Sequence, residues 1–320
     1  MWMEGSTSGV YRMWFQHMDI NRIPFYQYNT IIVGTGAAGL NAAVTLHKLG
    51  QKNIALITEG RYMGTSRNTG SDKQTYYKMT QCGSEPDSVR KMAKTLFEGG
   101  CVDGDIAMAE AAGSLRAFYH LVDIGVPFPF NKSGEYVGYK TDHDPLKRGI
   151  SAGPLTSKYM TECLERQAEE RGIPFFDGYQ AVRLLTEEKD GEKRAAGIIA
   201  LNKQKAASPD ERYAVFSAVN IIWATGGEAG MYQASVYPVS QTGGMGVLLE
   251  AGAVAKNLTE SQFGIASVKH RWNLSGTFQQ CLPRYLSAEQ DGSHEREFLN
   301  DYFDTPRQLL TAIFLKGYQW

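Results

Sequence analysis

Three glycines near the start of the chain are the residues whose spacing points most directly to chemistry. Gly34, Gly36 and Gly39 form a Gly-x-Gly-x-x-Gly pattern immediately after the apolar run 28–33. The first glycine permits a tight turn, the second leaves room for a pyrophosphate beside the backbone, and the third lets a helix lie close on a strand. Glu59 follows at the sequence separation where such motifs carry an acidic residue, whose carboxylate can accept hydrogen bonds from ribose hydroxyl groups. These residues predict a dinucleotide-binding turn.

Such a turn needs two strands and a helix to position it. Residues 28–33 and 54–58 are apolar and predict buried strands, and residues 37–49 between them predict a helix. The amino-terminal N–H groups of that helix and its positive dipole end would face the phosphates. The order strand, turn, helix, strand, acid indicates an α/β protein.

A second glycine turn lies far along the chain. The predicted strand 218–223 leads into Ala224, Thr225, Gly226 and Gly227, and Thr242-Gly243 opens a further helix that ends near residue 253. Two glycine turns at the ends of two strands are typical of a site for one extended ligand.

The remaining elements follow from periodicity and turn residues. Residues 60–71 are rich in glycine and hydroxyl groups and predict a loop over the site, whereas 127–149 predict an irregular ribbon. Helices are expected at 86–98, 104–124 and 154–171; strands at 174–176, 181–186, 195–201 and 212–216; and a hairpin turn at 188–191.

Composition restricts the class of protein. The 320 residues are 42% hydrophobic and carry a formal charge of −1, which gives no electrostatic attraction for nucleic acid or an anionic membrane. No stretch reaches the apolar length of a membrane span. The cysteines form no metal-binding pair and indicate reduced thiols in the cytoplasm; they are Cys82, Cys101, Cys163 and Cys281.

The combined motifs resemble a known family, the flavoprotein subunits of fumarate reductase and succinate dehydrogenase together with L-aspartate oxidase and related FAD-dependent reductases. The resemblance runs from about residue 29 to residue 302. It implies a Rossmann-like FAD/NAD(P)-binding α/β domain at 29–256, the beginning of an inserted α+β capping domain at 257–320, and an amino-terminal extension at 1–28. Met18 would be a natural start just before the first strand.

The resemblance also assigns roles to individual residues. The first turn would hold the FAD pyrophosphate, Glu59 the adenosine ribose, the loop after Glu59 the flavin, and the second turn the adenosine half. The residues assigned to the cofactor are Gly34, Gly36, Ala37, Ala38, Gly39, Glu59, Gly60, Thr65, Ser66, Arg67, Asn68, Ala181, Ala224, Thr225, Gly226, Thr242 and Gly243. Arg67 could instead be a solvated loop arginine, and Ala181 an ordinary strand residue.

Several family features are missing from this sequence. Some family members attach FAD through a histidine in the loop that here reads Ser66-Arg67-Asn68, so FAD should be held noncovalently. Gly264 stands where the family has a histidine at the substrate, which makes fumarate, succinate and aspartate poor candidates. The proton-donating arginine of the cap and the closing glycine segment do not appear before Trp320, which predicts a fragment of a longer flavoprotein.

The remaining basic residues of the cap are weak catalytic candidates. Arg271 or Arg284 could bind a carboxylate and His270 could relay protons, although a solvated surface loop explains them more simply. The run 142–144, Asp-His-Asp, is interpreted as a solvated turn because a proline follows it.

The sequence therefore predicts an FAD-dependent oxidoreductase that transfers hydride between flavin and a small substrate. An electron-donor protein or subunit would be its partner. Two alternatives stay open: a noncatalytic flavin-binding chain that needs a partner to complete its site, and an NAD-dependent dehydrogenase using the same first turn. The long loop after Glu59 and the Ala224–Gly227 turn favour FAD over the second alternative.

Overall fold

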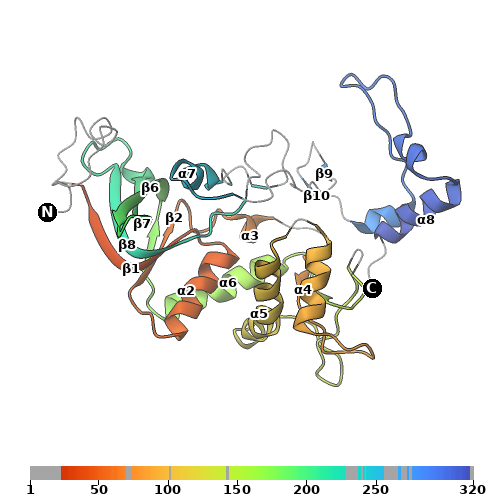
Figure 1. The fold of residues 1–320 in the computed structure, drawn as a ribbon, viewed down its shortest axis with the longest axis horizontal. Coiled ribbons are helices and arrows are strands. Elements are labelled where there is room, and N and C mark those ends of the chain that lie inside the picture. The colour runs from red at the N-terminus through yellow and green to blue at the C-terminus, as the bar shows by residue number, and fades with distance from the viewer. Residues whose placement is uncertain are drawn as a thin grey trace. The chain divides into compact units, whose positions relative to one another are not determined.

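A computed structural model describes residues 23–69, 74–100, 102–141, 144–227, 237–238, 241, 243–255, 266–267, 272–273 and 276–317. The chain divides into two compact units. Unit 1 is Met1–Thr69 with Ser157–Lys256, and unit 2 is Gly70–Thr156 with Asn257–Trp320. Figure 1 labels the elements of both. Among the described helices, none has the length and apolar character that crossing a membrane requires.

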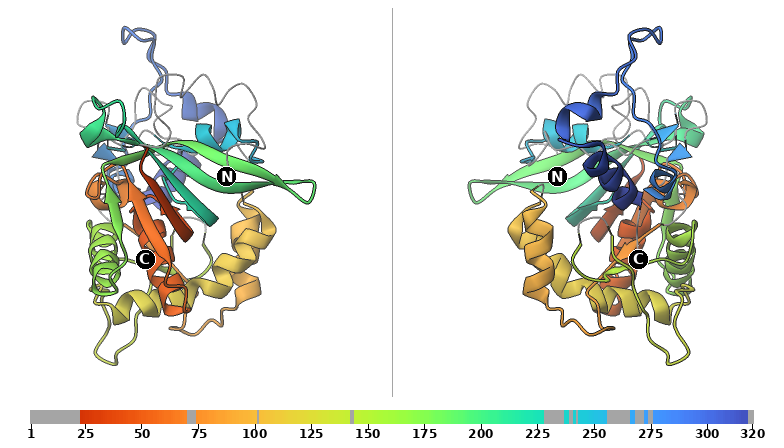
Figure 2. Two further views of the ribbon diagram at one scale, coloured as in Figure 1. Left: turned by 90° about the vertical axis from the view of Figure 1, so that its left-hand side faces the viewer. Right: turned by 90° about the vertical axis from the view of Figure 1, so that its right-hand side faces the viewer.

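Unit 1 is built on one six-stranded sheet. Its strands, in the order β5-β2-β1-β8-β7-β6, are β5 (Phe175–Asp177), β2 (Ile54–Thr58), β1 (Phe25–Val33), β8 (Tyr213–Trp223), β7 (Glu192–Asn202) and β6 (Tyr179–Lys189). The first four strands are parallel, and β7 and β6 extend the sheet in antiparallel fashion. Two further views show this sheet from its sides (Figure 2). The predicted α/β class is confirmed, with a sheet that is mostly parallel.

Apolar sequence explains why the central strands are buried. All five residues of β2 and the last four of β1 are buried, as expected of parallel strands covered on both faces. Helix α2 (Ala37–Lys48) buries Gly39, Leu40, Ala43 and Val44 and packs against β1, β2 and β8. This spacing places the four residues on one helix face.

Helices α6 (Thr156–Glu170) and α7 (Met245–Glu250) follow their predicted positions closely. Two other predictions were wrong. The segment 60–71 is not all loop, because it contains the short helix α3 (Thr65–Asn68). The strands expected on either side of Ser217 are one strand, β8, because Ser217 stays in register opposite Gly197 of β7. A single small polar residue does not interrupt the ladder.

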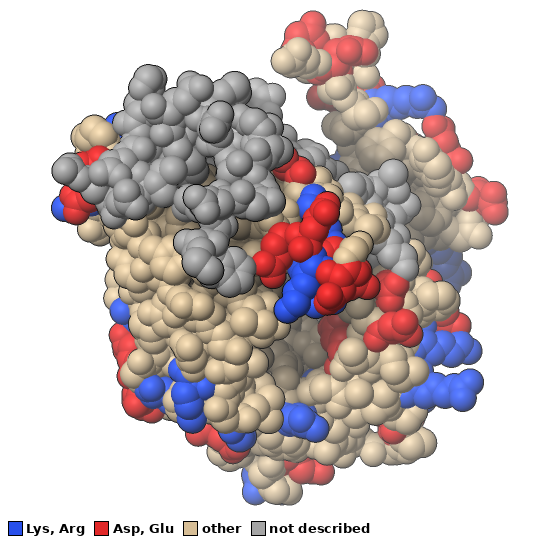
Figure 3. Space-filling model, turned by 60° about the vertical axis from the view of Figure 1, so that its left-hand side comes forward, with Lys and Arg blue, Asp and Glu red and all other residues tan. Residues whose placement is uncertain are grey.

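The hairpin between β6 and β7 was predicted correctly. Asp190 and Gly191 have φ of 55° and 78°, as a two-residue hairpin turn requires. Elsewhere in unit 1, η2 (Lys203–Lys205) follows β7 directly. Figure 3 shows acidic and basic side chains interspersed over one face of the molecule, in agreement with the small net charge.

Unit 2 contains the helices α4 (Val89–Glu98) and α5 (Gly104–Asp123), which pack against each other. Ser88 and Asp103 cap their amino termini. The other elements of unit 2 are β3 (Tyr76–Tyr77), β4 (Gly149–Ile150), β9 (Ala266–Ser267), β10 (Trp272–Asn273), η4 (Gly276–Cys281), η5 (Phe298–Tyr302) and α8 (Pro306–Gly317).

A buried ion cluster lies in the amino-terminal part of unit 2. Arg148 is fully buried and forms ion pairs with Asp87 at 2.8 Å and with Asp144 at 3.4 Å. Its guanidinium also donates to Tyr77 and to Thr95. The prediction of a solvated turn at 142–144 is therefore wrong for Asp144; the two residues before it lie outside the described part of the chain. The partner that decides its environment, Arg148, follows the predicted turn in sequence.

Candidate functional site

The two glycine turns meet at the carboxyl ends of neighbouring strands. Val33 ends β1 opposite Trp223, which ends β8, and the amide of Ala224 donates to the carbonyl oxygen of Val33 at 2.8 Å. On the other side, the amide of Gly34 donates to the carbonyl oxygen of Ile57 in β2, also at 2.8 Å. The chain positions that carry the glycine patterns are thus brought together by pairing of β1 with β2 and β8.

Gly34 is required where the turns touch. Its φ is +109°, and a Cβ on it would lie closer than 3.0 Å to the carbonyl oxygen of Ala224. A Cβ on Gly39 would similarly lie closer than 3.0 Å to the carbonyl oxygen of Gly34. The absence of a side chain at Gly39 therefore lets α2 pack closely against the backbone of the first glycine turn.

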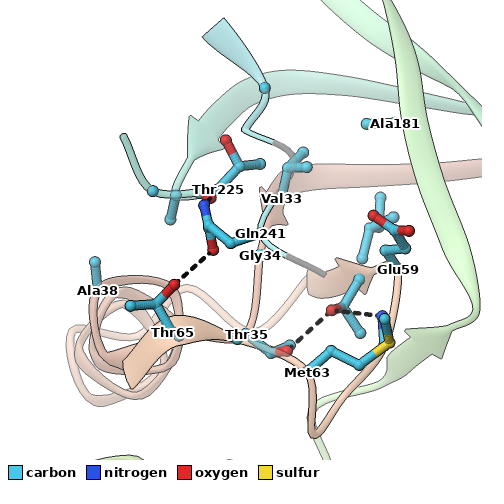
Figure 4. A pocket seen from close by; sticks show the side chains of 18 of the residues that line it. Val33, Gly34, Thr35, Ala38, Glu59, Met63, Thr65, Ala181, Thr225 and Gln241 are labelled. Carbon is cyan, nitrogen blue, oxygen red and sulfur yellow. Dashed lines mark hydrogen bonds between the residues drawn. The ribbon is translucent and has the colours of Figure 1, made fainter. Parts of the chain in front are cut away.

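A cavity of about 250 Å³ opens beside these turns. Many of the predicted cofactor residues line it, namely Gly34, Gly36, Ala37, Ala38, Glu59, Gly60, Thr65, Ser66, Ala181, Ala224, Thr225, Gly226 and Gly243. Figure 4 shows how residues from β1, α3, β6 and the second turn surround this space. The structure thus gathers distant parts of the chain around one pocket in unit 1.

Among the other predicted residues, Asn68 and Arg284 are described and do not line this pocket. Asn68 donates to the carbonyl oxygens of Tyr62 and Gly64, so its side chain shapes the loop. Arg284, in unit 2, is largely exposed and donates to Glu297 at 2.6 Å. Thr242, His270, Arg271 and Gly264 lie outside the described residues.

Arg67 takes part in an ion cluster with helix α6. Its guanidinium pairs with Glu165, which also accepts from Arg61 at 2.7 Å. The exposed fractions are 13% for the Arg67 side chain and 11% for the Glu165 side chain, so this is a largely buried contact and not a solvated loop arginine. The cluster attaches the loop carrying α3 to α6.

Glu59 has a partner at the pocket edge. Its carboxylate accepts from Lys203 Nζ at 2.7 Å, and the two side chains are 27% and 41% exposed. A ribose hydroxyl that binds Glu59 would share this carboxylate with the ammonium group. The lysine therefore restricts the orientation of the carboxylate at the pocket rim.

Sequence reasoning missed several pocket residues. Gln241, Trp223, Thr35, Thr58 and Met63 also line the cavity. Thr35 donates to Thr58 at 3.0 Å and joins the ends of β1 and β2. The position of Thr35 between Gly34 and Gly36 could have indicated that it lies at the pocket. Gln241, before α7, belongs to no motif that the sequence analysis recognised.

The pocket fits a dinucleotide by its own geometry. Gly36, the N-cap residue of α2, has no side chain to cap the helix, and the amide of Ala37 donates to Ser66 Oγ at 3.2 Å. Trp223 Nε1 and Thr225 Oγ1 are buried without a hydrogen-bond partner among the described residues, and both residues line the cavity. Backbone amides at a helix start and unpartnered donors suit phosphate and hydroxyl oxygens.

The sequence of this region matches the model of the FAD binding domain over residues 29–283. The chain belongs to the FAD binding domain family. FAD is therefore the cofactor of this family, and the family resemblance inferred from the sequence motifs is confirmed.

Curated relatives of this FAD binding domain include oxidoreductases. The chain is 28% identical over 242 residues to L-aspartate oxidase of Agrobacterium fabrum, covering 73% of the chain and 42% of that protein. It is 27% identical over 271 residues to the 8-methylmenaquinol:fumarate reductase flavoprotein subunit of Wolinella succinogenes, covering 83% of the chain and 42% of that protein. The chain thus spans less than half the length of these relatives.

Solved structures share the fold. A point mutant of the E. coli quinol fumarate reductase subunit FrdA superposes with a TM-score of 0.70 at 20% identity, over 91% of this chain and 50% of that one. The open conformation of a flavocytochrome c3 fumarate reductase gives a TM-score of 0.69 at 18% identity, over 97% and 54%. At these identities the likeness supports the fold.

Proposed function

We propose that the chain holds FAD noncovalently and forms the cofactor-binding part of an oxidoreductase acting on a small substrate. The observation that carries this proposal is the convergence of both glycine turns and Glu59 on one cavity. Bound FAD would supply hydride transfer at its flavin ring. The chain's own residues orient the cofactor: α2 directs its positive amino-terminal end to the pyrophosphate, and Glu59 accepts from the adenosine ribose.

The finer assignments belong to the same proposal. Ser66, Arg67 and Asn68 replace the histidine-containing loop of covalent flavoproteins, which supports noncovalent attachment. The proposal also includes a substrate that bears a carboxylate, an electron-donor protein or subunit as partner, and a cytoplasmic location. It further includes an FAD-binding domain that ends at residue 256 and a capping domain that begins after it.

The first experiment is direct. The purified 320-residue chain is titrated with FAD while the fluorescence of the flavin is followed, and the loaded protein is then precipitated with acid. We expect saturable binding and complete release of yellow FAD into the supernatant. Absence of binding would refute the proposal, and flavin retained in the precipitate would refute noncovalent attachment.

Changing Glu59 to alanine is expected to weaken FAD binding about 30-fold, because a charged hydrogen-bond acceptor for the ribose is lost. The measurement is the dissociation constant of FAD. Glu211→Ala is the matched control, since Glu211 forms a comparable exposed pair with Lys205 at 3.1 Å away from the pocket lining. An unchanged dissociation constant in Glu59→Ala would rule out its ribose role.

A further inference from the structure

The side chain of Gln241 connects two walls of the FAD pocket. Its Oε1 accepts from Thr65 Oγ1 at 2.9 Å, and its Nε2 donates to the carbonyl oxygen of Thr225 at 2.6 Å. Figure 4 shows this side chain between Thr65 and Thr225, with the bond to Thr65 drawn. One amide group thus links the start of α3 to the second glycine turn.

Helix α3 is held from two sides by such bonds. Ser66, next to Thr65, accepts from the backbone amide of Ala37 at 3.2 Å, and Ala37 begins α2 after the first glycine turn. The Thr65-Gln241 bond makes the corresponding link to the second turn. A four-residue helix has little internal cooperativity, so these contacts, together with the Arg67–Glu165 ion pair, fix its position.

The second turn is shaped around the Gln241 amide. Gly226 has a φ of +87°, and a Cβ there would lie closer than 3.0 Å to Gln241 Nε2. The backbone at Gly226 therefore lies so close to the Gln241 amide group that a side chain at position 226 would displace it. Gln241 also lines the cavity, as do Thr65, Thr225 and Gly226.

We propose that Gln241 is a positioning residue that sets the spacing of the FAD pocket by bridging Thr65 to the Thr225 carbonyl. The inference rests on the proposed function, because it concerns how the pocket is kept ready for FAD. Oε1 and Nε2 each have a protein partner, so Gln241 acts through those two segments. A preformed pocket avoids the cost of ordering α3 when the cofactor binds.

The test begins with Gln241→Ala and Thr65→Val in the full chain. Each variant is expected to raise the dissociation constant of FAD about tenfold, since each breaks the bridge. The dissociation constant of the double variant should be no higher than that of the single variant that binds FAD less tightly. Once one change has broken the bridge, the other has no bridge left to break. Gln167→Ala, on α6 and outside the pocket lining, is the matched control and should bind as the wild type does.

A glutamate at position 241 gives an independent readout. The neutral acid can donate a hydrogen bond to the carbonyl oxygen of Thr225, and the carboxylate cannot. Relative to wild type, Gln241→Glu should therefore lose FAD affinity as the pH rises through the glutamate pKa, which is ordinarily about 4.3. Repulsion between the carboxylate and the FAD phosphates would act in the same direction, so the decisive result is a pH-independent affinity, which would contradict the bridge.

The outcomes separate the two proposals. If the wild-type chain fails to bind FAD, the proposed function is overturned. If the wild type binds FAD and Gln241→Ala binds equally well, the bridge is overturned. Independent, multiplying effects of Gln241→Ala and Thr65→Val would overturn it too, as would a pH-independent Gln241→Glu.

Discussion

Replacing Gly34 by alanine is expected to weaken FAD binding at least about 100-fold and to destabilise unit 1 by about 3 kcal/mol. The backbone at Gly34 has a φ of +109°, which alanine rarely adopts. The added methyl group would also lie closer than 3.0 Å to the Ala224 carbonyl oxygen. Because that atom is backbone, relief requires separating the ends of β1 and β8.

FAD titration and urea unfolding would measure these two effects. Gly113→Ala is the control, because a Cβ at this helical position meets nothing within 4 Å. Alanine there should stabilise the protein by about 0.5 to 1 kcal/mol through helix propensity. If Gly34→Ala bound FAD as tightly as the wild type, the close approach of Gly34 to the Ala224 carbonyl oxygen would not be needed for binding.

The second large effect is expected from Asp87→Ala in unit 2, which should lower the free energy of unfolding by about 3 to 5 kcal/mol. Asp87 accepts from Arg148 Nε at 2.9 Å and from Nη2 at 2.8 Å. Both side chains are buried, with 1% and 0% exposure. Removing the carboxylate leaves the guanidinium buried with only part of its charge compensated by Asp144.

This cluster also predicts a pH dependence. Burial by itself would raise the pKa of Asp87, but hydrogen bonds from Arg148 and from the amides of Thr80 and Ser88 outweigh it and lower the pKa. A lowered pKa in the folded state gives stability that is present above about pH 4 and is lost as the pH falls through the folded-state value. Asp87→Asn should lack this component, so its unfolding free energy should vary less in acid.

Urea unfolding as a function of pH tests both statements. Glu98→Ala, which breaks the exposed pair with Lys94, is the matched control and should change stability by less than about 1 kcal/mol. If Asp87→Ala costs no more than this control, the ion cluster contributes little to unit 2.

Local pattern was enough to predict the framework of the site. The turn at Gly34, the helix after it and the acid at Glu59 are close in sequence, and each follows from backbone conformation and periodicity. The second turn was recognisable because an apolar strand precedes Ala224. Each of these features can be recognised from residues that are close to one another in the sequence.

The missed features depend on distant partners. Gln241 matters because Thr65 is brought to it, and Arg67 is buried because Glu165 of α6 faces it. Asp144 follows the same rule through Arg148. A polar residue in a glycine-rich or turn-like segment gives no sign of its partner until the sheet has been assembled.

The strand order of unit 1 has a consequence for synthesis of the chain. β1 emerges from the ribosome before β8, and its edge is completed only when Val33 can pair with Trp223. Until then its apolar residues lack their neighbour, and no pocket exists for the cofactor. Pairing between such distant segments slows folding, so newly made chain would acquire FAD only after β8 has been translated, and chaperones would have a long interval in which to bind the exposed strand.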